Sequence, residues 1–195
     1  LLQLAQEWAS RTGRKLIAAT VDHGLRKEAA AEADWVKSQC AELGVSHDTL
    51  IWRPPAELKV TQAQARQARH HLLYDWAKRQ GASYILLGHT HDDVLETHLM
   101  RKRAGSSQFG LAGPAASSPA PFWPEGRTLT LVRPLLSQSR QSLMDWLSAQ
   151  GRRWINDPSN EDDVYERVRA RREIAGMSAA LRQQLEADVD AARRY

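Results

Sequence analysis

The stretch YILLGHTHDD (residues 84–93) joins an apolar run to two histidines and two adjacent carboxylates. A short continuous apolar run of this kind is typical of a strand that is buried on both faces in a parallel sheet. Open parallel sheets bind their ligands beyond the carboxyl ends of the strands. The polar residues that follow the run therefore fall where a binding site is expected.

The segments on either side of this stretch alternate between strand and helix patterns. We expect strands at residues 15–21, 47–51, 83–87 and 128–132, and helices at 1–12, 28–43, 62–80, 91–103 and 139–150, with one or two charged helices in 162–192. The alternation predicts an α/β fold, an open and mostly parallel sheet with helices on both faces. Residues 105–121, rich in small residues, are expected to form a long loop.

The composition limits the classes of protein that the chain can belong to. With 195 residues, 42% of them hydrophobic, it can form one sizeable core, and we expect an α/β domain over 1–158 followed by a helical, Arg-rich linker or the start of a second domain over 159–195. The net charge of +4 is compatible with a polyanionic partner. Because the chain does not begin with Met, we expect it to start inside a larger protein.

The cysteine count and the hydropathy pattern predict a cytoplasmic protein. Cys40 is the single cysteine, which excludes an internal disulfide and a CxxC metal site, and its helical spacing predicts that it is buried. No apolar run approaches the roughly 20 residues that a membrane-spanning helix needs, so we expect no membrane partner. A homodimer is one of the oligomeric states that the sequence leaves open.

Two of the expected strands end in polar clusters. One cluster begins with Asp22 and His23 and includes Arg26, and the other is residues 89–93. Parallel strands bring their carboxyl ends to the same edge, so we expect the two clusters to share one crevice. A histidine beside a carboxylate can supply a base, a proton donor or a magnesium ligand, and the residue types alone do not choose between these roles.

The second cluster also has a structural and a metal interpretation. Thr90 can begin a helix as its N-cap, with Asp93 completing a capping box and the carboxylates favoured by the helix dipole. Residues 89–93 also resemble the first part of the HxHxDH signature of metallo-β-lactamase-like hydrolases. That signature requires a histidine where this chain has Val94, and all seven histidines lie at or before His98, so a two-metal site cannot be completed.

The motifs of the whole chain, taken in order, resemble those of the tRNA(Ile)-lysidine synthases of the PP-loop ATP-pyrophosphatase superfamily. They are VDHGLR (21–26), QARQAR (64–69), GHTHDDVLET (88–97, the family's GHxxDDxxET), GLAG (110–113), RPLL (133–136) and DPSN (157–160) before an Arg-rich helix. The GHxxDD motif alone indicates the superfamily. The DPSN segment before the arginines narrows the resemblance to lysidine synthases.

The resemblance implies a ligase that forms a carbon–nitrogen bond during tRNA modification. ATP, with Mg²⁺, would adenylate the wobble cytidine of tRNA(Ile) with a CAU anticodon, and the ε-amine of free L-lysine would then displace AMP. Matching positions would give His89 and Asp93 as the catalytic pair, Asp22, His23 and Arg26 around the nucleotide, Arg66, Arg69, Arg167 and Arg171 on the substrate, and Asp92 as a ligand of Mg²⁺.

The arginine spacings agree with these implied roles. Arg66 and Arg69 lie three residues apart on one face of an expected helix, so they could hold phosphate or tRNA together. Arg167 and Arg171 match the first and last positions of the family's RNRIR pattern and are expected to face the same way. Solvated helix arginines are the alternative for both pairs.

Three departures from the family pattern affect the expected activity. The SGGxDS loop that grips pyrophosphate is absent from the printed sequence, so we expect the chain by itself to bind ATP unproductively and to be inactive. Ala104 begins an AGSS stretch where the family has RGSG, and Val168 replaces the asparagine of RNRIR. The roles of these two positions stay open.

Two other functions remain to be weighed. Another PP-loop activity, tRNA thiolation, uses CxxC pairs, and the lone Cys40 argues against it. A non-catalytic α/β module that only holds a nucleotide would have the same crevice. Lysine- and tRNA-dependent release of AMP distinguishes the ligase from such a module.

Overall fold

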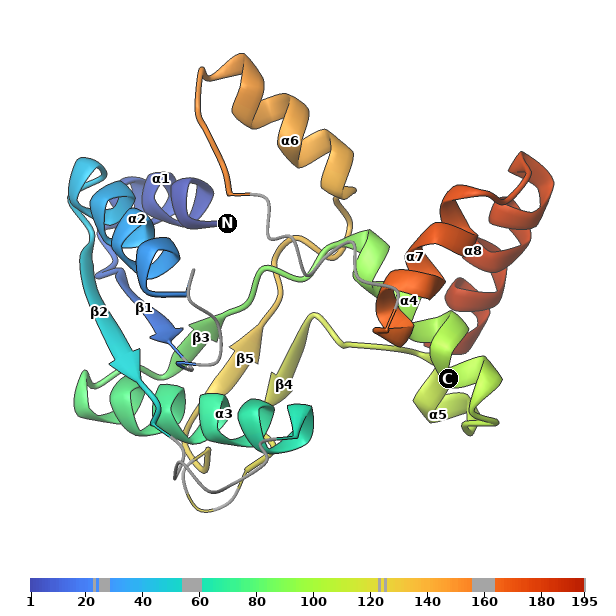
Figure 1. Cartoon of the computed structure of the whole chain (residues 1–195), viewed down its shortest axis with the longest axis horizontal. Helices are drawn as coiled ribbons and strands as arrows, with labels where there is room; N and C mark the ends of the chain where they lie inside the picture. The colour runs from blue at the N-terminus through green and yellow to red at the C-terminus, as the bar shows by residue number, and fades with distance from the viewer. Residues whose placement is uncertain are drawn as a thin grey trace. The chain divides into compact units, whose positions relative to one another are not determined.

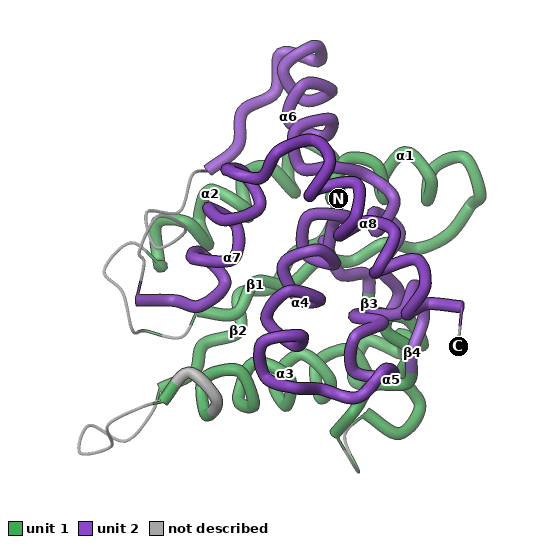
Figure 2. The backbone as a smooth tube through the Cα atoms, turned by 90° about the vertical axis from the view of Figure 1, so that its right-hand side faces the viewer, with its two compact units in different colours: residues 1–85, 119–131 green, residues 86–118, 132–195 purple. Residues whose placement is uncertain are grey.

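The computed structural model of the chain describes residues 1–22, 24, 29–53, 61–122, 124, 126–155 and 164–194. His23, Arg26 and the DPSN segment, all singled out from the sequence, lie outside these residues. The chain divides into two compact units (Figure 2): unit 1 is Leu1–Ile85 with Pro119–Leu131, and unit 2 is Leu86–Ser118 with Val132–Tyr195.

Unit 1 contains a parallel strand pair covered by helices. Its elements are α1 (Leu2–Thr12), β1 (Ile17–Asp22), α2 (Ala29–Glu42), β2 (Ser46–Ile51) and α3 (Gln62–Arg79). Strands β1 and β2 run parallel, with Ile17 opposite Ser46 and Asp22 opposite Ile51. Helix α2 packs against both strands and α3 packs against β1 (Figure 1). Cys40 is fully buried on α2, as its spacing predicts.

A three-stranded sheet has the order β3-β5-β4, from β3 (Tyr84–Leu86), β5 (Thr130–Val132) and β4 (Ser117–Pro119). The bonds from Thr130 N to Ser83 O (2.9 Å) and from Leu87 N to Val132 O (2.8 Å) advance together along both strands, so β3 and β5 are parallel. The bonds from Ala120 N to Leu129 O and from Arg133 N to Ala116 O advance in opposite directions, so β4 is antiparallel. The predicted α/β class with a mostly parallel sheet is confirmed.

Unit 2 is mainly helical. It contains α4 (His91–Arg103), α5 (Gln108–Leu111), α6 (Arg140–Ala149), α7 (Glu166–Ala175) and α8 (Ala179–Arg193). Its core joins α4 to the C-terminal helices through Val94, Leu95, Leu136, Ile174, Leu185 and Val189. The Arg-rich helix α7 therefore packs on α4. The domain boundary expected near residue 158 falls outside the described residues and stays a prediction.

The structure corrects the prediction of one long loop at 105–121, because this segment contains α5 and β4. Both elements are too short, at 4 and 3 residues, to show a hydrophobic period. Strand β4 ends at Pro119, a residue that sheets accept at an edge. Among the described helices, none combines the length and the apolar character required to cross a membrane.

Candidate functional site

Helix α4 begins with the capping box that its sequence predicts. Thr90 is the N-cap, and Oδ2 of Asp93 accepts hydrogen bonds from its backbone N–H (2.8 Å) and its hydroxyl (2.9 Å). These bonds satisfy the backbone N–H and the hydroxyl of the buried N-cap residue and place the Asp93 carboxylate at the positive end of the helix dipole. The structural role of Asp93 is therefore confirmed.

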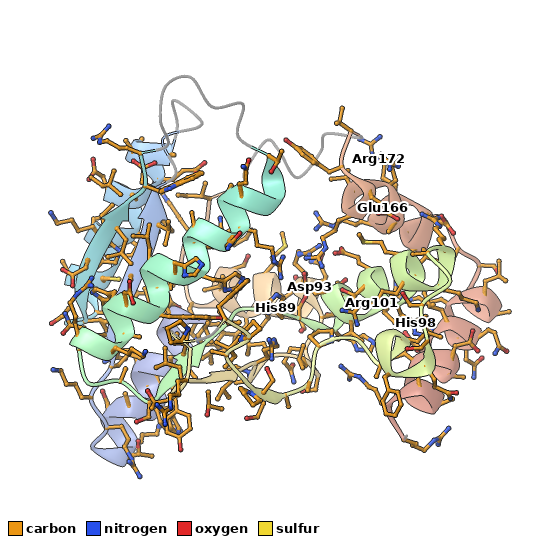
Figure 3. All side chains as sticks on the ribbon, turned by 90° about the horizontal axis from the view of Figure 1, so that it is seen from below. His89, Asp93, His98, Arg101, Glu166 and Arg172 are labelled. Carbon is orange, nitrogen blue, oxygen red and sulfur yellow. The ribbon has the colours of Figure 1, made fainter. Side chains whose placement is uncertain are left out.

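The surroundings of Asp93 keep it ionised. Burial raises the pKa of Asp93, but the hydrogen bonds from the Thr90 backbone and hydroxyl, together with the charges of Arg167 and His89, lower that pKa below its usual value. Figure 3 shows His89 and Asp93 close together where α4 begins. The pair thus combines a carboxylate with a half-buried imidazole.

Three arginines surround Glu96, which lies one turn after Asp93 and is only 1% exposed. Its Oε1 is 2.8 Å from Nε of Arg171 and 3.7 Å from a terminal guanidinium nitrogen of Arg140. Its Oε2 is 3.7 Å from Nε of Arg167. A carboxylate buried this deeply requires such compensation, because isolated burial of a charge is costly.

Arg167 connects Glu96 to the start of α4. One terminal nitrogen lies 3.4 Å from Oδ1 of Asp93, and the other donates to the Thr97 hydroxyl at 3.2 Å. Arg167 and Arg171 therefore face α4 together, as their spacing predicts. Arg169 is exposed and donates to the Val164 carbonyl instead.

Val168, at the position of the family's asparagine, is buried with 5% exposure. A branched apolar side chain at such a position contributes packing, and it offers no side-chain hydrogen bond. In this chain the position therefore belongs to the buried face of α7.

Asp92 joins α4 to α6. Its Oδ2 accepts the backbone N–H of Arg140, the first residue of α6, at 2.7 Å. Beside it is a pocket of about 90 Å³, lined by Asp92, Glu96, Arg171, Ile174, Ala175 and Arg182. Within the part of the chain that the structure describes, no group of three or more His, Cys, Asp or Glu side chains is arranged to hold a metal ion.

The other predicted site residues with described positions belong to unit 1. Asp22 ends β1, and its Oδ1 accepts the backbone N–H of Gly24 at 2.8 Å. Arg66 and Arg69 are exposed on α3, and their charges add to burial in lowering the pKa of His70 to about 4. Since Asp22 and Asp93 are in different units, their convergence at one crevice stays a prediction.

Residues 1–177 of the chain match the PP-loop domain family. The chain belongs to the PP-loop domain family. This PP-loop domain resembles curated tRNA(Ile)-lysidine synthases, which confirms the resemblance inferred from the motifs. The chain is 45% identical to the tRNA(Ile)-lysidine synthase of Hyphomonas neptunium over 172 residues, which cover 88% of this chain and 46% of the relative. It is 46% identical to the tRNA(Ile)-lysidine synthase of Ruegeria pomeroyi over 178 residues, which cover 91% of this chain and 41% of the relative.

The chain thus spans less than half the length of these two relatives. A solved structure with the same PP-loop fold is the U34-tRNA thiolase NcsA from Methanococcus maripaludis with its 4Fe-4S cluster. The TM-score is 0.78 with 14% identity, over 99% of this chain and 65% of the thiolase chain. At this identity the likeness concerns the fold alone.

The structure of this PP-loop domain gathers some predicted residues and adds others. His89, Asp92, Asp93, Arg167 and Arg171 all lie around the start of α4. Sequence reasoning missed Glu96, Thr97 and Arg140. The signal for Glu96 was present in GHxxDDxxET, because a residue three positions after Asp93 shares its helix face.

Proposed function

We propose that the complete protein is an ATP-dependent ligase of the tRNA(Ile)-lysidine synthase type, acting in the cytoplasm. ATP adenylates the carbonyl oxygen of the wobble cytidine in a CAU anticodon and releases pyrophosphate. The ε-amine of free L-lysine then attacks the activated carbon, forms the carbon–nitrogen bond and releases AMP. The motif order and the identities of 45% and 46% to curated lysidine synthases support this proposal.

The observation that carries the proposal is the Arg167 bridge from Asp93 to Glu96 at the start of α4. It holds the Asp93 carboxylate in one place beside His89, and both residues fall in the motif that defines the resemblance. A general base works best with a pKa near the operating pH, so the lowered pKa of Asp93 makes it a poor proton acceptor. We therefore assign proton removal from lysine to His89 and electrostatic orientation of His89 and the incoming ammonium to Asp93.

Residues of the first polar cluster and Asp92 would take part in binding ATP and its metal ion. Asp22, His23 and Arg26 would lie around ATP. Asp92 fits a role as one ligand of Mg²⁺, because Oδ2 accepts the Arg140 N–H while Oδ1 makes no hydrogen bond with the described residues. Magnesium commonly takes one or two protein carboxylates and completes its shell with phosphate oxygens and water. When bound, it would offset charge on the phosphates.

The arginines would divide the work of substrate binding. Arg66 and Arg69, exposed on α3, would contact phosphates of the tRNA. Arg167 and Arg171 first neutralise Asp93 and Glu96, and their side chains remain 40% and 30% exposed. A guanidinium has five donors, so both can also bind substrate oxygens from the solvent side.

The test is an assay of AMP release by the complete protein, expressed from the full reading frame that encodes these residues. The proposal predicts release only when ATP, lysine and a CAU-anticodon tRNA are all present. ATP binding without such release would favour the non-catalytic nucleotide module. The environment of Cys40 does not support a thiolase, since the side chain is fully buried and burial raises the pKa of its thiol.

A further inference from the structure

Helix α5 and the three residues after it are fixed to α4 and α8 through their backbone carbonyls. We call residues 108–114 the α5 segment. The bonds run from His98 Nδ1 to Leu111 O (3.0 Å), from Arg101 to Gly110 O, and from Arg193 to Ala112 O (3.2 Å) and Pro114 O (3.1 Å). Figure 3 labels His98 and Arg101 on α4. A segment held by side chains at four of its backbone carbonyls has little conformational freedom left to lose on binding.

Two glycines make the α5 segment compact. A Cβ on Gly110 would lie 2.9 Å from the Ser106 Cβ, so only glycine fits there without a shift. Gly113 has a φ of +69°, which favours glycine, and it packs beside Val94 of the unit 2 core. The conformation of the α5 segment therefore depends on glycine at both positions.

This fixed segment presents Phe109 to solvent with 81% of its surface exposed. A single exposed apolar side chain is common and needs no function by itself. Here side chains of α4 and α8 restrain the backbone next to Phe109, so the ring is attached to a nearly rigid segment. Rigid aromatic side chains contribute strongly to binding because little entropy is lost when they are covered.

The charge around Phe109 indicates the kind of partner. Lys102 and Arg103 of α4 are paired with Asp188 and Glu173. Arg101 and Arg193 instead donate to carbonyls of the α5 segment, and among the described residues neither has a carboxylate within salt-bridge distance. Their positive charge is thus not compensated, which favours an anionic partner over an apolar protein face.

We propose that Phe109 is a stacking surface for an unpaired nucleobase of the RNA substrate, with Arg101 and Arg193 attracting the adjacent phosphates. Base stacking on an aromatic ring next to cationic side chains is the general mode of binding single-stranded nucleic acid. This inference rests on the proposed function, which requires an RNA loop as substrate. It adds a base contact from a position that none of the family motifs assigns a role.

A double-mutant cycle on the complete protein tests the inference. A CAU-anticodon tRNA transcript is prepared with each anticodon-loop nucleotide in turn made abasic, and its affinity is measured for wild type and Phe109→Ala. Phe109→Ala weakens binding of the intact transcript about tenfold. For one abasic position the same substitution has almost no further effect, since the base that it contacts is already missing.

Matched variants separate stacking from other causes. Phe109→Trp keeps wild-type affinity, Phe109→Leu behaves like alanine, and Leu181→Ala, which removes a side chain 61% exposed on α8, changes nothing. Losses that are additive at every loop position, or equal for Phe109→Ala and Leu181→Ala, overturn the inference, as does binding of a second protein copy at Phe109 in place of RNA. The wild type's AMP release is scored separately: its absence refutes the proposed function, while the cycle still tests the stacking contact.

Discussion

Nε of Arg171 lies 2.8 Å from Oε1 of Glu96, joining two residues that are 75 positions apart in the chain. This contact joins α7 to α4 at a carboxylate that is 1% exposed. With Arg140 and Arg167 it forms a cluster in which three cations share one buried anion. The arginines of α7 therefore have an internal structural role in addition to any contact with substrate.

The first prediction concerns the stability that Glu96 provides. Glu96→Gln removes the buried anion and leaves three clustered cations, so we expect the free energy of unfolding to fall by about 2–3 kcal/mol. Glu173→Gln is the matched control, because Glu173 pairs with Arg103 at about 40% exposure on both sides. Exposed pairs of this kind contribute at most about 1 kcal/mol. Urea unfolding of both variants measures the two free energies. Equal losses would show that the buried Glu96 cluster stabilises the fold no more than an exposed ion pair does.

The second prediction concerns the geometry of the Arg167 bridge. Lysine keeps the positive charge, but it cannot direct donors to Asp93, Glu96 and Thr97 at once. We expect Arg167→Lys to lower kcat for lysine-dependent AMP release by about tenfold or more. Arg169→Lys is the control, because Arg169 lies two positions after Arg167 on the exposed face of α7, and this variant should keep the wild-type rate. An unchanged rate for Arg167→Lys would show that the bridging geometry of Arg167 is not needed for the reaction.

The third prediction concerns Asp93 itself. Asp93→Asn retains an oxygen that can accept from Thr90 but loses the charge beside His89, so we expect AMP release to fall at least about 100-fold with the fold preserved. Circular dichroism of the variant checks the fold. Near-normal turnover would exclude Asp93 from the reaction.

The lowered pKa of Asp93 also gives the same variant a pH signature. A carboxylate with a folded pKa below its unfolded value of 3.8 stabilises the protein above that value, and the contribution is lost as the pH falls through the folded pKa. The wild type should therefore lose more stability than Asp93→Asn on acidification below pH 3.8. Parallel acid-unfolding curves would contradict this assignment.

The fourth prediction concerns His70 on α3. Burial, with the charges of Arg66 and Arg69, lowers the pKa of His70 from 6.5 to about 4, so the unfolded chain binds the proton first. Stability should thus decrease as the pH falls from 6.5 towards 4, by about 2 kcal/mol after allowance for solvent screening. His70→Asn, which can still hydrogen bond to Tyr74, should flatten this part of the stability profile. An equally steep profile in the variant would assign the effect to other groups.

Local features of unit 2 could be predicted from the sequence, whereas the contacts between its helices could not. Helix α4 was expected at 91–103 and spans His91–Arg103, because its capping box lies within four consecutive residues. The bond from Arg140 to Asp92 spans 48 positions and the bond from Arg171 to Glu96 spans 75. Such pairs depend on where α6 begins relative to α4 and on how α7 packs on α4, and hydrophobic periodicity specifies neither.

The loop between α4 and β5 shows the same limit. Its glycines and prolines indicated turns, and the structure adds α5 and β4. Each of these depends on tertiary partners: α5 on α4 and α8, and β4 on β5. Phe109 is exposed only because of this packing, so its position could not be foreseen from the sequence.

The most direct measurement of the central claim uses isotope-labelled L-lysine. The complete protein is incubated with ATP and a CAU-anticodon tRNA, and the tRNA is digested to nucleosides for mass spectrometry. If the protein is a lysidine synthase, the wild type forms one labelled nucleoside from the wobble cytidine and Asp93→Asn forms none. Recovery of unmodified cytidine from wild type, under conditions in which ATP and the tRNA are both bound, would contradict the proposed function.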